Sequence, residues 1–385
     1  MNNIKTLTEY AVIGGGPAAI CAIAKLYSYG IPGNKIIWVD PQFKVGDFGT
    51  KLSTGSSVPG NTTVASYQKV NNAIYTAIPA CVPTVEQKIK FEITVLSPNT
   101  TCSLRVATQP LQHITETLRK LVYSIKGIVH AVYTTKDGIR LDIKTNDIIS
   151  NVMVKRVILA IGASPKTIKL PDYITIIDPY TVFVKSELKQ YLDKNPNITT
   201  VAVIGSSHSA ALATMHLVQA GIHVKQFMNK EYKFAMPAIA PDGTRYIQYD
   251  NTGLKGEVAT FTRQLLHDKK TDKTKYAQLW EYYIEKNIEA LLSTRLSKCT
   301  HAVICIGYTP SSSLQINGLS ISTFKYNKYS TQIIHADGRP VTRIFGIGIA
   351  YPTEVIATSG EIEFAVGVEK FWNSINDATL HKWIS

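Results

Sequence analysis

Short apolar runs and helically spaced apolar residues alternate along much of this chain. Residues 10–13 form an apolar run that enters a glycine-rich turn, and apolar residues then recur at helical spacing over residues 18–29. A glycine and a proline end this predicted helix, and residues 35–39 form a second apolar strand that finishes in Asp40. The pattern predicts a strand–helix–strand unit at the start of the chain.

The same order of elements returns in mid-chain. Residues 199–204 predict a buried strand, a helix follows and runs to residue 220, and residues 224–228 predict the next strand. Three further apolar strands break at glycines, at residues 157–161, 302–306 and 343–347. An amphipathic helix is predicted for residues 109–125, and a C-terminal helix from near residue 361. Together these elements predict an α/β fold with two Rossmann-like dinucleotide-binding domains.

The first glycine turn has the residues that a dinucleotide site needs. It reads G-x-G-x-x-A, in which Gly14 permits the tight turn, Gly16 lets backbone approach a pyrophosphate and Ala19 lets helix and strand pack closely. The N-terminus of the following helix then faces the phosphates with its partial positive charge. Asp40 is placed to accept hydrogen bonds from a ribose. The alternative is a plain βαβ turn that binds no ligand.

The second turn, residues 205–210, departs from this pattern. Ser207 stands where the middle glycine usually lies, and its side chain makes close approach of a phosphate harder. The next strand is followed by Lys230 instead of ending in an acid, which favours the 2′-phosphate of NADP. Lys230 and Lys233 are therefore candidate contacts, with a solvated lysine loop as the alternative. His208 is placed to contact phosphate or sugar, but capping of the helix by its neighbours explains this turn as well.

Composition limits the class of protein. The chain has 385 residues and a mass of 42.5 kDa, which suits two domains. Hydrophobic residues make up 45% and charged residues 18%, so a disordered or collagen-like chain is excluded. The net charge of +13 favours polyanionic partners, phosphorylated ligands or an anionic substrate. Nucleic acid is not indicated, because the basic residues are scattered and their densest cluster, residues 269–275, reads as a solvated loop.

The cysteines and the apolar runs predict the cellular compartment of the protein. The five cysteines form no C-x-x-C pair and are odd in number, so a disulfide framework is not expected and a reducing compartment is. No stretch reaches the roughly 18 apolar residues of a membrane span, and the N-terminus lacks the layout of a signal peptide. We therefore expect a cytoplasmic protein without a membrane contact. No histidine or cysteine has metal-ligand spacing, so no metal is expected.

Taken together, these motifs resemble the two-dinucleotide-binding-domain flavoproteins, and most closely the FAD- and NADPH-dependent flavin-containing and N-hydroxylating monooxygenases. The resemblance covers nearly the whole chain. The first turn and Asp40 match the FAD fingerprint, and the second turn is similar to the NADPH turn G-x-G-x-S-A of the N-hydroxylating enzymes. The apolar strands that end at Gly162 and Gly307 look like the two connections between the FAD and NAD(P) domains.

The resemblance implies two sets of cofactor-binding residues. For FAD they are Gly14, Gly16, Pro17, Ala18, Ala19, Asp40, Gly46, Phe48, Gly162 and Gly348. For NADPH they are Gly205, Ser207, His208, Ser209, Ala210 and Lys230. Gly46 and Phe48 belong to a segment that, with residues 58–61, loosely resembles the segments covering the flavin in monooxygenases; a glycine-rich loop is the alternative. Ile349 stands where the family usually has an aspartate that binds the ribityl chain.

The resemblance also implies the domain order and the reaction. The FAD domain is expected to be split into residues 1–166 and 311–385, with the NAD(P) domain, residues 167–310, inserted between them. Disulfide reductases of this superfamily carry a C-x-x-x-x-C or C-x-x-C dithiol next to the flavin. This chain has neither motif, which excludes the disulfide-reductase branch. What remains is an FAD-dependent oxidoreductase, in which NADPH reduces the flavin and one atom of oxygen passes to a small molecule. No catalytic side chain is identified, and the oligomeric state stays open.

Two alternatives to a monooxygenase follow from the same residues. One is an NAD(P)H oxidase or flavin reductase, which has the same fold and no organic substrate. The other is a non-catalytic, flavoprotein-like scaffold, in which Ser207 and Ile349 mark lost catalysis.

Overall fold

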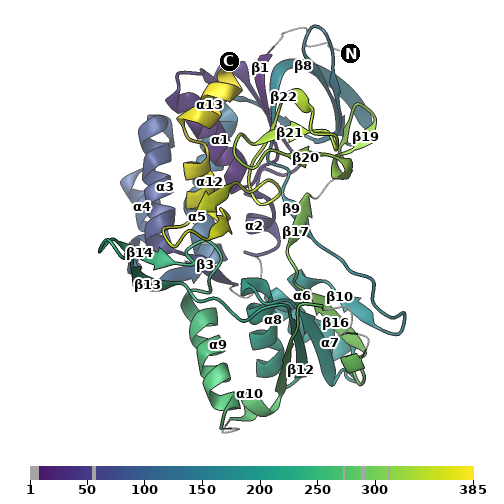
Figure 1. The fold of residues 1–385 in the computed structure, drawn as a ribbon. Helices are drawn as coiled ribbons and strands as arrows, with labels where there is room; N and C mark the ends of the chain where they lie inside the picture. The colour runs from purple at the N-terminus through teal and green to yellow at the C-terminus, as the bar shows by residue number, and fades with distance from the viewer. Residues whose placement is uncertain (1–7, 54–57, 272–273, 288–291, 293, 311–312) are drawn as a thin grey trace.

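The computed structural model describes residues 8–53, 58–271, 274–287, 292, 294–310 and 313–385. The chain folds into two lobes (Figure 1). One lobe holds the first strand, β1 (Thr8–Ile13), and the last helix, α13 (Asp377–Ile384). The middle of the chain forms the other lobe, so the first lobe is assembled from both ends of the sequence.

The first lobe is built on an 11-stranded mixed sheet. Its parallel part runs in the order β22 (Pro340–Gly346), β8 (Ile148–Leu159), β1, β2 (Ile36–Asp40) and β5 (Tyr123–Lys126). The first half of β8 also pairs antiparallel with β7 (Ile139–Thr145), which pairs antiparallel with β6 (Ile128–Thr134). The long strand β8 therefore joins a parallel sheet to an antiparallel meander.

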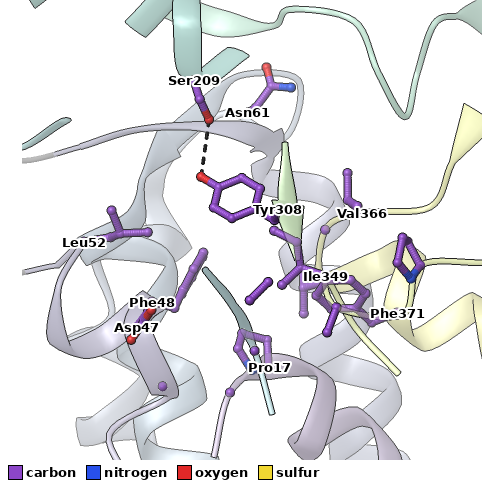
Figure 2. A pocket seen from close by; sticks show the side chains of 18 of the residues that line it. Pro17, Asp47, Phe48, Leu52, Asn61, Ser209, Tyr308, Ile349, Val366 and Phe371 are labelled. Carbon is purple, nitrogen blue, oxygen red and sulfur yellow. Dashed lines mark hydrogen bonds between the residues drawn. The ribbon is translucent and has the colours of Figure 1, made fainter. Parts of the chain in front are cut away.

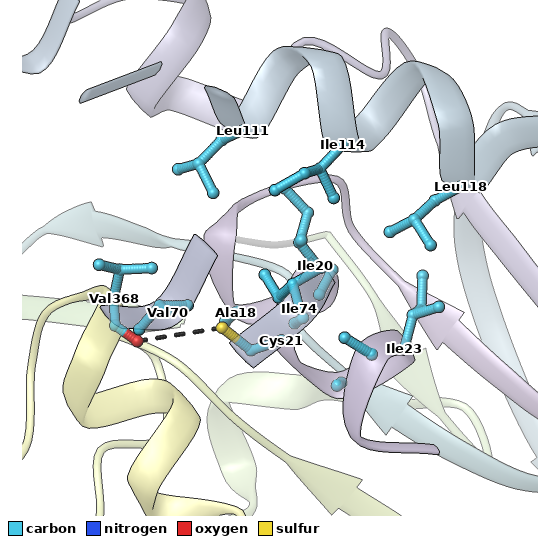
Figure 3. Close-up of a cluster of buried hydrophobic side chains, with 14 of the residues drawn as sticks. Ala18, Ile20, Cys21, Ile23, Val70, Ile74, Leu111, Ile114, Leu118 and Val368 are labelled. Carbon is cyan, nitrogen blue, oxygen red and sulfur yellow. Dashed lines mark hydrogen bonds between the residues drawn. The ribbon is translucent and has the colours of Figure 1, made fainter. Parts of the chain in front are cut away.

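Alternation along β1 divides the core of this lobe into two layers. Tyr10 and Val12 face the helices, whereas Ala11 and Ile13 face the meander. The helical layer contains α1 (Pro17–Ser28), α3 (Val64–Ala77), α5 (Leu104–Leu121) and α12 (Val368–Ser374). Figure 3 shows Leu111, Ile114 and Leu118 of α5 above apolar side chains of α1. This packing fixes the N-terminal end of α1 above the sheet.

The second lobe repeats this design on a smaller scale. Its five parallel strands run in the order β10 (Thr175–Ile177), β16 (His301–Ile304), β11 (Thr200–Ile204), β12 (His223–Met228) and β15 (Trp280–Ile284). The helices of this lobe whose bounds the structure describes are α6 (Pro179–Phe183), α7 (Lys185–Lys194), α8 (His208–Gln219), α9 (Gly256–Lys269) and α10 (Lys275–Gln278). Helix α8 follows β11 directly, as α1 follows β1, so each lobe presents one glycine turn at the end of its central strand.

Two short strands mark where the chain passes between the lobes. Strand β9 (Ala163–Pro165) leads into the second lobe and β17 (Tyr308–Pro310) leads out of it. They pair antiparallel, with Tyr308 opposite Pro165. The predicted boundaries at residues 166 and 310 lie at this crossing, and they stay a prediction.

The remaining elements are short. The helical ones are η1 (Gly33–Lys35), α2 (Gly46–Thr50), η2 (Pro79–Cys81), α4 (Val85–Ile89), η3 (Glu92–Val95) and η4 (Ile321–Thr323). The strands are β3 (Pro59–Thr63), β4 (Thr101–Ser103), β13 (Met236–Ile239), β14 (Arg245–Gln248), β18 (Gln315–Ile316), β19 (Leu319–Ser320), β20 (Lys325–Tyr326), β21 (Gln332–Ile334), β23 (Glu354–Ile356) and β24 (Ile362–Phe364). Over the described part of the chain, no helix has the length and apolar character needed to cross a membrane.

Two predicted helices have different bounds in the structure. Helix α5 begins at Leu104, not at residue 109, because the side chain of Ser103 caps it by accepting a hydrogen bond from the Val106 N–H at 3.4 Å. It ends at Leu121, since residues 123–126 pair with β2 as the edge strand β5. The predicted C-terminal helix near residue 361 is wrong there, because residues 362–364 pair with β23 as β24. Helix α12 begins only after Gly367.

Candidate active site

A cleft of about 1330 Å³ separates the two lobes, and both glycine turns line it. This volume exceeds the roughly 300–1,000 Å³ of a typical site for one small molecule. Figure 2 shows side chains from both lobes meeting across it, among them Pro17 from one lobe and Ser209 from the other. The cleft therefore has room for more than one ligand.

The first turn is held by backbone contacts that require glycine. Gly14 has φ +111°, and a Cβ atom at this position would lie 2.1 Å from the carbonyl oxygen of Ala160, the residue after the neighbouring strand β8. The Gly14 N–H donates to the Val39 carbonyl at 2.8 Å. The indole N–H of Trp38 donates to the Gly14 carbonyl at 2.7 Å, so the turn is fixed from two sides.

The space in front of Gly16 is open, whereas backbone atoms of a neighbouring segment crowd Gly14. Its backbone is extended, with φ −78° and ψ 178°, and a Cβ atom there would meet nothing within 4 Å. Gly46 lies directly against it, since a Cβ atom on Gly46 would be 3.1 Å from the Gly16 Cα. Gly46, the first residue of α2, has φ +59°, a conformation that favours glycine. The two glycines thus leave a strip of bare backbone on the cleft wall, which fits close approach of a phosphate chain.

Asp40 lies beside this strip and is 7% exposed. Its carboxylate accepts a hydrogen bond from the Gln42 N–H at 2.9 Å and another from the Phe43 N–H. Burial raises the pKa of Asp40, although backbone N–H groups, including that of Gly15, act in the opposite direction. Gly15 has no room for a side chain, because its Cβ atom would lie 2.5 Å from the Asp40 carboxyl carbon.

The second turn repeats the construction of the first. Gly205 has φ +138°, and a Cβ atom there would lie 2.2 Å from the Cys305 carbonyl oxygen. Its N–H donates to the Phe227 carbonyl at 2.8 Å. The side-chain amide of Gln226 donates to the Gly205 carbonyl at 3.0 Å, in the role that Trp38 has in the first lobe.

Trp38 and Gln226 also occupy equivalent places in the two sheets. Trp38 pairs with Val12, which lies two residues before its turn, and Gln226 pairs with Val203, which lies two residues before the other. Gln226 is fully buried, and its side-chain oxygen accepts hydrogen bonds from Trp280 at 3.0 Å and Thr214 at 3.2 Å. The second turn is therefore anchored to a buried polar network.

Both helices that start at these turns lack a side-chain cap. Helix α1 begins after Gly16 and α8 after Ser207, and neither residue's side chain accepts a hydrogen bond from its helix. In α3 and α5, by contrast, Thr63 and Ser103 supply such caps. Neither N-cap residue therefore satisfies the first N–H groups of α1 or α8 with its side chain, and each 12-residue helix adds its dipole at the cleft.

The other residues predicted for the second turn have varied surroundings. Ala210 is buried under Gly205, and the hydroxyls of Ser209 and Tyr308 lie 3.5 Å apart. The His208 side chain packs toward Pro59, and burial lowers the pKa of His208 to about 4. Ser207 is exposed at the cleft wall.

The two candidate lysines are not equivalent. Lys230 is exposed at the edge of the cleft. The ammonium of Lys233 lies 3.3 Å from the Glu361 carboxylate of the other lobe and 4.2 Å from the centre of the Tyr249 ring. Lys233 therefore forms a contact between the lobes. Lys230 is the more available of the two ammonium groups for a ligand in the cleft.

The remaining predicted residues for the first cofactor also line or support the cleft. Phe48, on α2, lies 6.3 Å from the ring of Tyr67. Gly162 has φ +70° and faces open space. Gly348 has φ +89°, and a Cβ atom on it would lie 2.7 Å from the Cβ of Ala18 in α1. Pro17 lines the cleft, whereas Ala18 and Ala19 are buried beneath it.

Hydrogen bonds fasten the second lobe to the first at one end of the cleft. The side chain of Asn61 donates to the Gly253 carbonyl at 3.0 Å and accepts from the Lys255 N–H at 2.7 Å. Glu363, 2% exposed, accepts from the Asn251 N–H at 3.0 Å and from the Thr252 hydroxyl at 2.9 Å. These contacts hold residues 251–255 of the second lobe against β3 and β24 of the first.

Several of these residues were not predicted from the sequence. Trp38 and Gln226 lie in predicted strands. Each stands two residues before the end of its strand, and this position could have marked it as a residue close to a glycine turn. Residues 58–61 had been noted only as a loose resemblance to a flavin-covering segment. The residues near the C-terminus that line the cleft gave no local signal, because their place depends on how distant segments pack.

Two glycine turns, two sheets and one shared cleft define a two-dinucleotide-binding-domain flavoprotein. The sequence profile of pyridine nucleotide-disulphide oxidoreductases matches residues 8–348. The chain belongs to this family.

Particular relatives agree with this assignment. The chain is 31% identical to monooxygenase AgnR1 of Paecilomyces divaricatus, over 97% of each chain. Its fold is similar to those of DfoA, a cadaverine monooxygenase of Erwinia amylovora solved with FAD, and KtzI, an ornithine N-hydroxylase of Kutzneria sp. 744. For DfoA the TM-score is 0.62 at 12% identity, over 98% of this chain and 95% of that one. For KtzI the TM-score is 0.62 at 13% identity, over 98% of both chains.

These findings confirm the main predictions. The fold is the expected pair of Rossmann-like domains. The protein is an FAD-dependent oxidoreductase with a monooxygenase among its relatives, so the scaffold alternative is not supported. The individual site residues stay predictions.

Proposed function

We propose that this protein is an NADPH-dependent flavin monooxygenase that transfers one oxygen atom from O₂ to a small molecule. Bound FAD would supply the hydride acceptor and the oxygen chemistry. The chain's own residues bind and orient the two nucleotides and the substrate in the cleft. The supporting observation is that two 12-residue helices without side-chain caps begin at one shared cleft.

The residues present fit the two cofactors. Gly16 and Gly46 leave bare backbone beside the N-terminus of α1, where a pyrophosphate is stabilised by N–H groups and the helix dipole. Asp40 stands next to them at the position of the ribose acceptor. Around the second turn, the N-terminus of α8 and Lys230 offer the same kind of binding to NADPH. FAD is thus assigned to the first turn and NADPH to the second.

The proposal also covers the charge of the substrate and the cellular compartment of the protein. Among the described residues that line the cleft, six lysines stand against four carboxylates, which supports anionic ligands: Lys51, Lys166, Lys230, Lys233, Lys255 and Lys370 against Asp40, Asp47, Asp250 and Glu369. All five cysteines are buried and free, which supports a reducing compartment such as the cytoplasm.

Anaerobic mixing with NADPH tests the function directly. The purified protein is expected to be yellow, and its flavin absorbance should bleach when NADPH is added without oxygen. Admitting oxygen should restore the colour. Bleaching by neither NADPH nor NADH in FAD-loaded protein would reject the proposal. Recovery of all NADPH electrons as hydrogen peroxide with every substrate tried would favour the oxidase alternative.

Lys230→Glu is expected to remove most of the preference for NADPH over NADH. A charge-assisted hydrogen bond to the 2′-phosphate contributes roughly 1.5–3 kcal/mol, which corresponds to about tenfold to a hundredfold in preference. Stopped-flow flavin reduction at low nucleotide concentration measures it. Lys286→Glu, a lysine outside the cleft lining, is the matched control and should keep the wild-type ratio. An unchanged ratio in Lys230→Glu would remove this residue from the site.

Gln226→Leu is expected to weaken NADPH binding about fivefold to tenfold while FAD content stays normal. The change removes the donor that fixes the Gly205 carbonyl, and one hydrogen bond contributes roughly 1–1.5 kcal/mol. Trp38→Phe is the matched experiment in the other lobe and should lower FAD affinity instead. Titration of each nucleotide into each variant gives both values. Equal loss of both cofactors in either variant would show a general folding defect.

A further inference from the structure

His208 is the first residue of α8 and lines the cleft at the second turn. Its backbone N–H is one of the groups at the helix start that face the place assigned to the pyrophosphate of NADPH. The equivalent residue of the first lobe is Pro17, the first residue of α1. Proline has no side chain that titrates. The second turn therefore differs from the first by an imidazole ring beside its nucleotide site.

One nitrogen of the His208 ring is not used by the described part of the chain. The ring packs toward the Pro59 backbone of the first lobe, and its Nδ1 is buried without a hydrogen-bond partner among the described residues. A neutral imidazole has one donor and one acceptor nitrogen, whereas an imidazolium has two donors. The ring can therefore take a proton once a negative charge lies near enough to stabilise the imidazolium.

In the nucleotide-free protein this ring is neutral. Burial lowers the pKa of His208 to about 4, the Lys255 ammonium acts in the same direction, and the Pro59 backbone opposes both. The partial positive charge at the start of α8 also disfavours the imidazolium. At neutral pH His208 is therefore uncharged before a nucleotide binds.

The charged groups on the elements around this ring do not reverse that state. Lys255 precedes α9, and its ammonium lies 3.5 Å from the Asp250 carboxylate. Glu257, in the first turn of α9, is exposed. Helix α6, which packs against α8, and residues 58–61 carry no charged side chain. Within the described residues no carboxylate stabilises an imidazolium here, so a bound anion has to supply the negative charge.

Resting on the proposed function, we propose that binding of NADP⁺ or NADPH at the second turn is coupled to the uptake of a proton by His208. The pyrophosphate brings its negative charges to the start of α8, and an opposite charge nearby stabilises the protonated form of a histidine. The proton comes from solvent, and the imidazolium that forms attracts the pyrophosphate in return. Because the bound state holds more protons than the free state, nucleotide affinity rises as the pH falls.

Calorimetric titration of NADP⁺ into FAD-loaded protein measures this coupling. Titrations at about pH 6 in two buffers of different ionisation enthalpy give the number of protons taken up. A phosphate monoester such as the 2′-phosphate titrates near this pH as well, so wild type is compared with His208→Gln, whose side chain does not ionise. Wild type should take up about half a proton more than the variant.

Two outcomes of this titration contradict the proposal in different ways. Equal proton uptake by wild type and His208→Gln would overturn the coupling and leave the proposed function standing. Absence of NADP⁺ binding in wild type would overturn both, and bleaching of the flavin by NADPH, measured separately, shows whether the proposed function fails.

The affinities at two pH values give an independent check. Between about pH 8 and about pH 5.5, wild type should gain about fourfold in NADP⁺ affinity relative to His208→Gln. His301→Gln is the matched control, because His301 is a histidine of the same lobe outside the cleft lining, and burial lowers its pKa too. This control should keep the wild-type gain. A ratio of wild type to His208→Gln that does not change with pH would overturn the coupling.

NAD⁺ tests the coupling in wild type alone, in case His208→Gln does not fold. NAD⁺ carries the pyrophosphate without the 2′-phosphate, so a proton taken up near pH 6 is bound by the protein. Wild type should again take up about half a proton. Binding of NAD⁺ without proton uptake would overturn the proposal.

Discussion

Gly16→Val is expected to abolish FAD retention while the protein still folds. The residue has extended φ and ψ that valine adopts without strain, and its Cβ would enter open space, so the fold has no reason to reject it. The same open space is the path of the pyrophosphate in front of α1. A branched side chain there would weaken FAD binding on the order of a hundredfold, as expected for an overpacking cost of up to about 3 kcal/mol.

Three measurements separate loss of the cofactor from loss of the fold. Visible absorbance gives the FAD content, far-ultraviolet circular dichroism checks the fold, and urea unfolding of both apoproteins compares their stability, which should agree within about 0.5 kcal/mol. Gly16→Ala is the graded control and should retain FAD more weakly than wild type but better than Gly16→Val. Normal FAD content in folded Gly16→Val protein would contradict the placement of FAD at the first turn.

Acid is expected to destabilise the second lobe through His216. This side chain is 2% exposed on α8, its Nδ1 lies 2.9 Å from the Val182 carbonyl, and its Nε2 has no hydrogen-bond partner among the described residues. Burial, and to a smaller extent the Lys185 ammonium, lower the pKa of His216 to about 4, while the hydrogen bond to Val182 opposes this. The unfolded chain, with a histidine pKa near 6.5, therefore binds the proton first.

The sign and size of this effect follow from linkage. Because the folded pKa is the lower one, the stabilisation is complete above about pH 6.5 and is lost as the pH falls toward about 4. Between pH 7 and pH 5 the loss amounts to about 2 kcal/mol. His216→Gln should show a correspondingly smaller drop in urea-unfolding free energy over this range, whereas His335→Gln, a histidine of the other lobe, should not. Equal pH dependence of wild type and His216→Gln would refute the assignment.

The two glycine turns were readable from the sequence because their constraints are local. A glycine at φ +111° or +138° and a small residue at the helix start are requirements of the turn itself, so G-x-G-x-x-A and residues 205–210 predicted both lobes correctly. The amphipathic period of α5 was visible for the same reason. Its bounds were misplaced because a serine cap and pairing of residues 123–126 with β2 decide where the helix ends.

Tertiary structure alone decided how the site is completed. The position of Gln226 near the end of its strand placed it close to the second turn but did not show that its amide holds the Gly205 carbonyl. Lys233 could not be seen to face Glu361, since the two residues are brought close by packing and not by sequence spacing. The cleft lining combines Ile349 with residues of the C-terminal segment, which the sequence had placed in a helix from near residue 361. Strand β24 forms instead because β23 offers it a hydrogen-bonding edge. Local conformation follows from nearby residues, whereas a cleft follows from distant segments that bury apolar surface together, and only the folded chain brings those segments into contact.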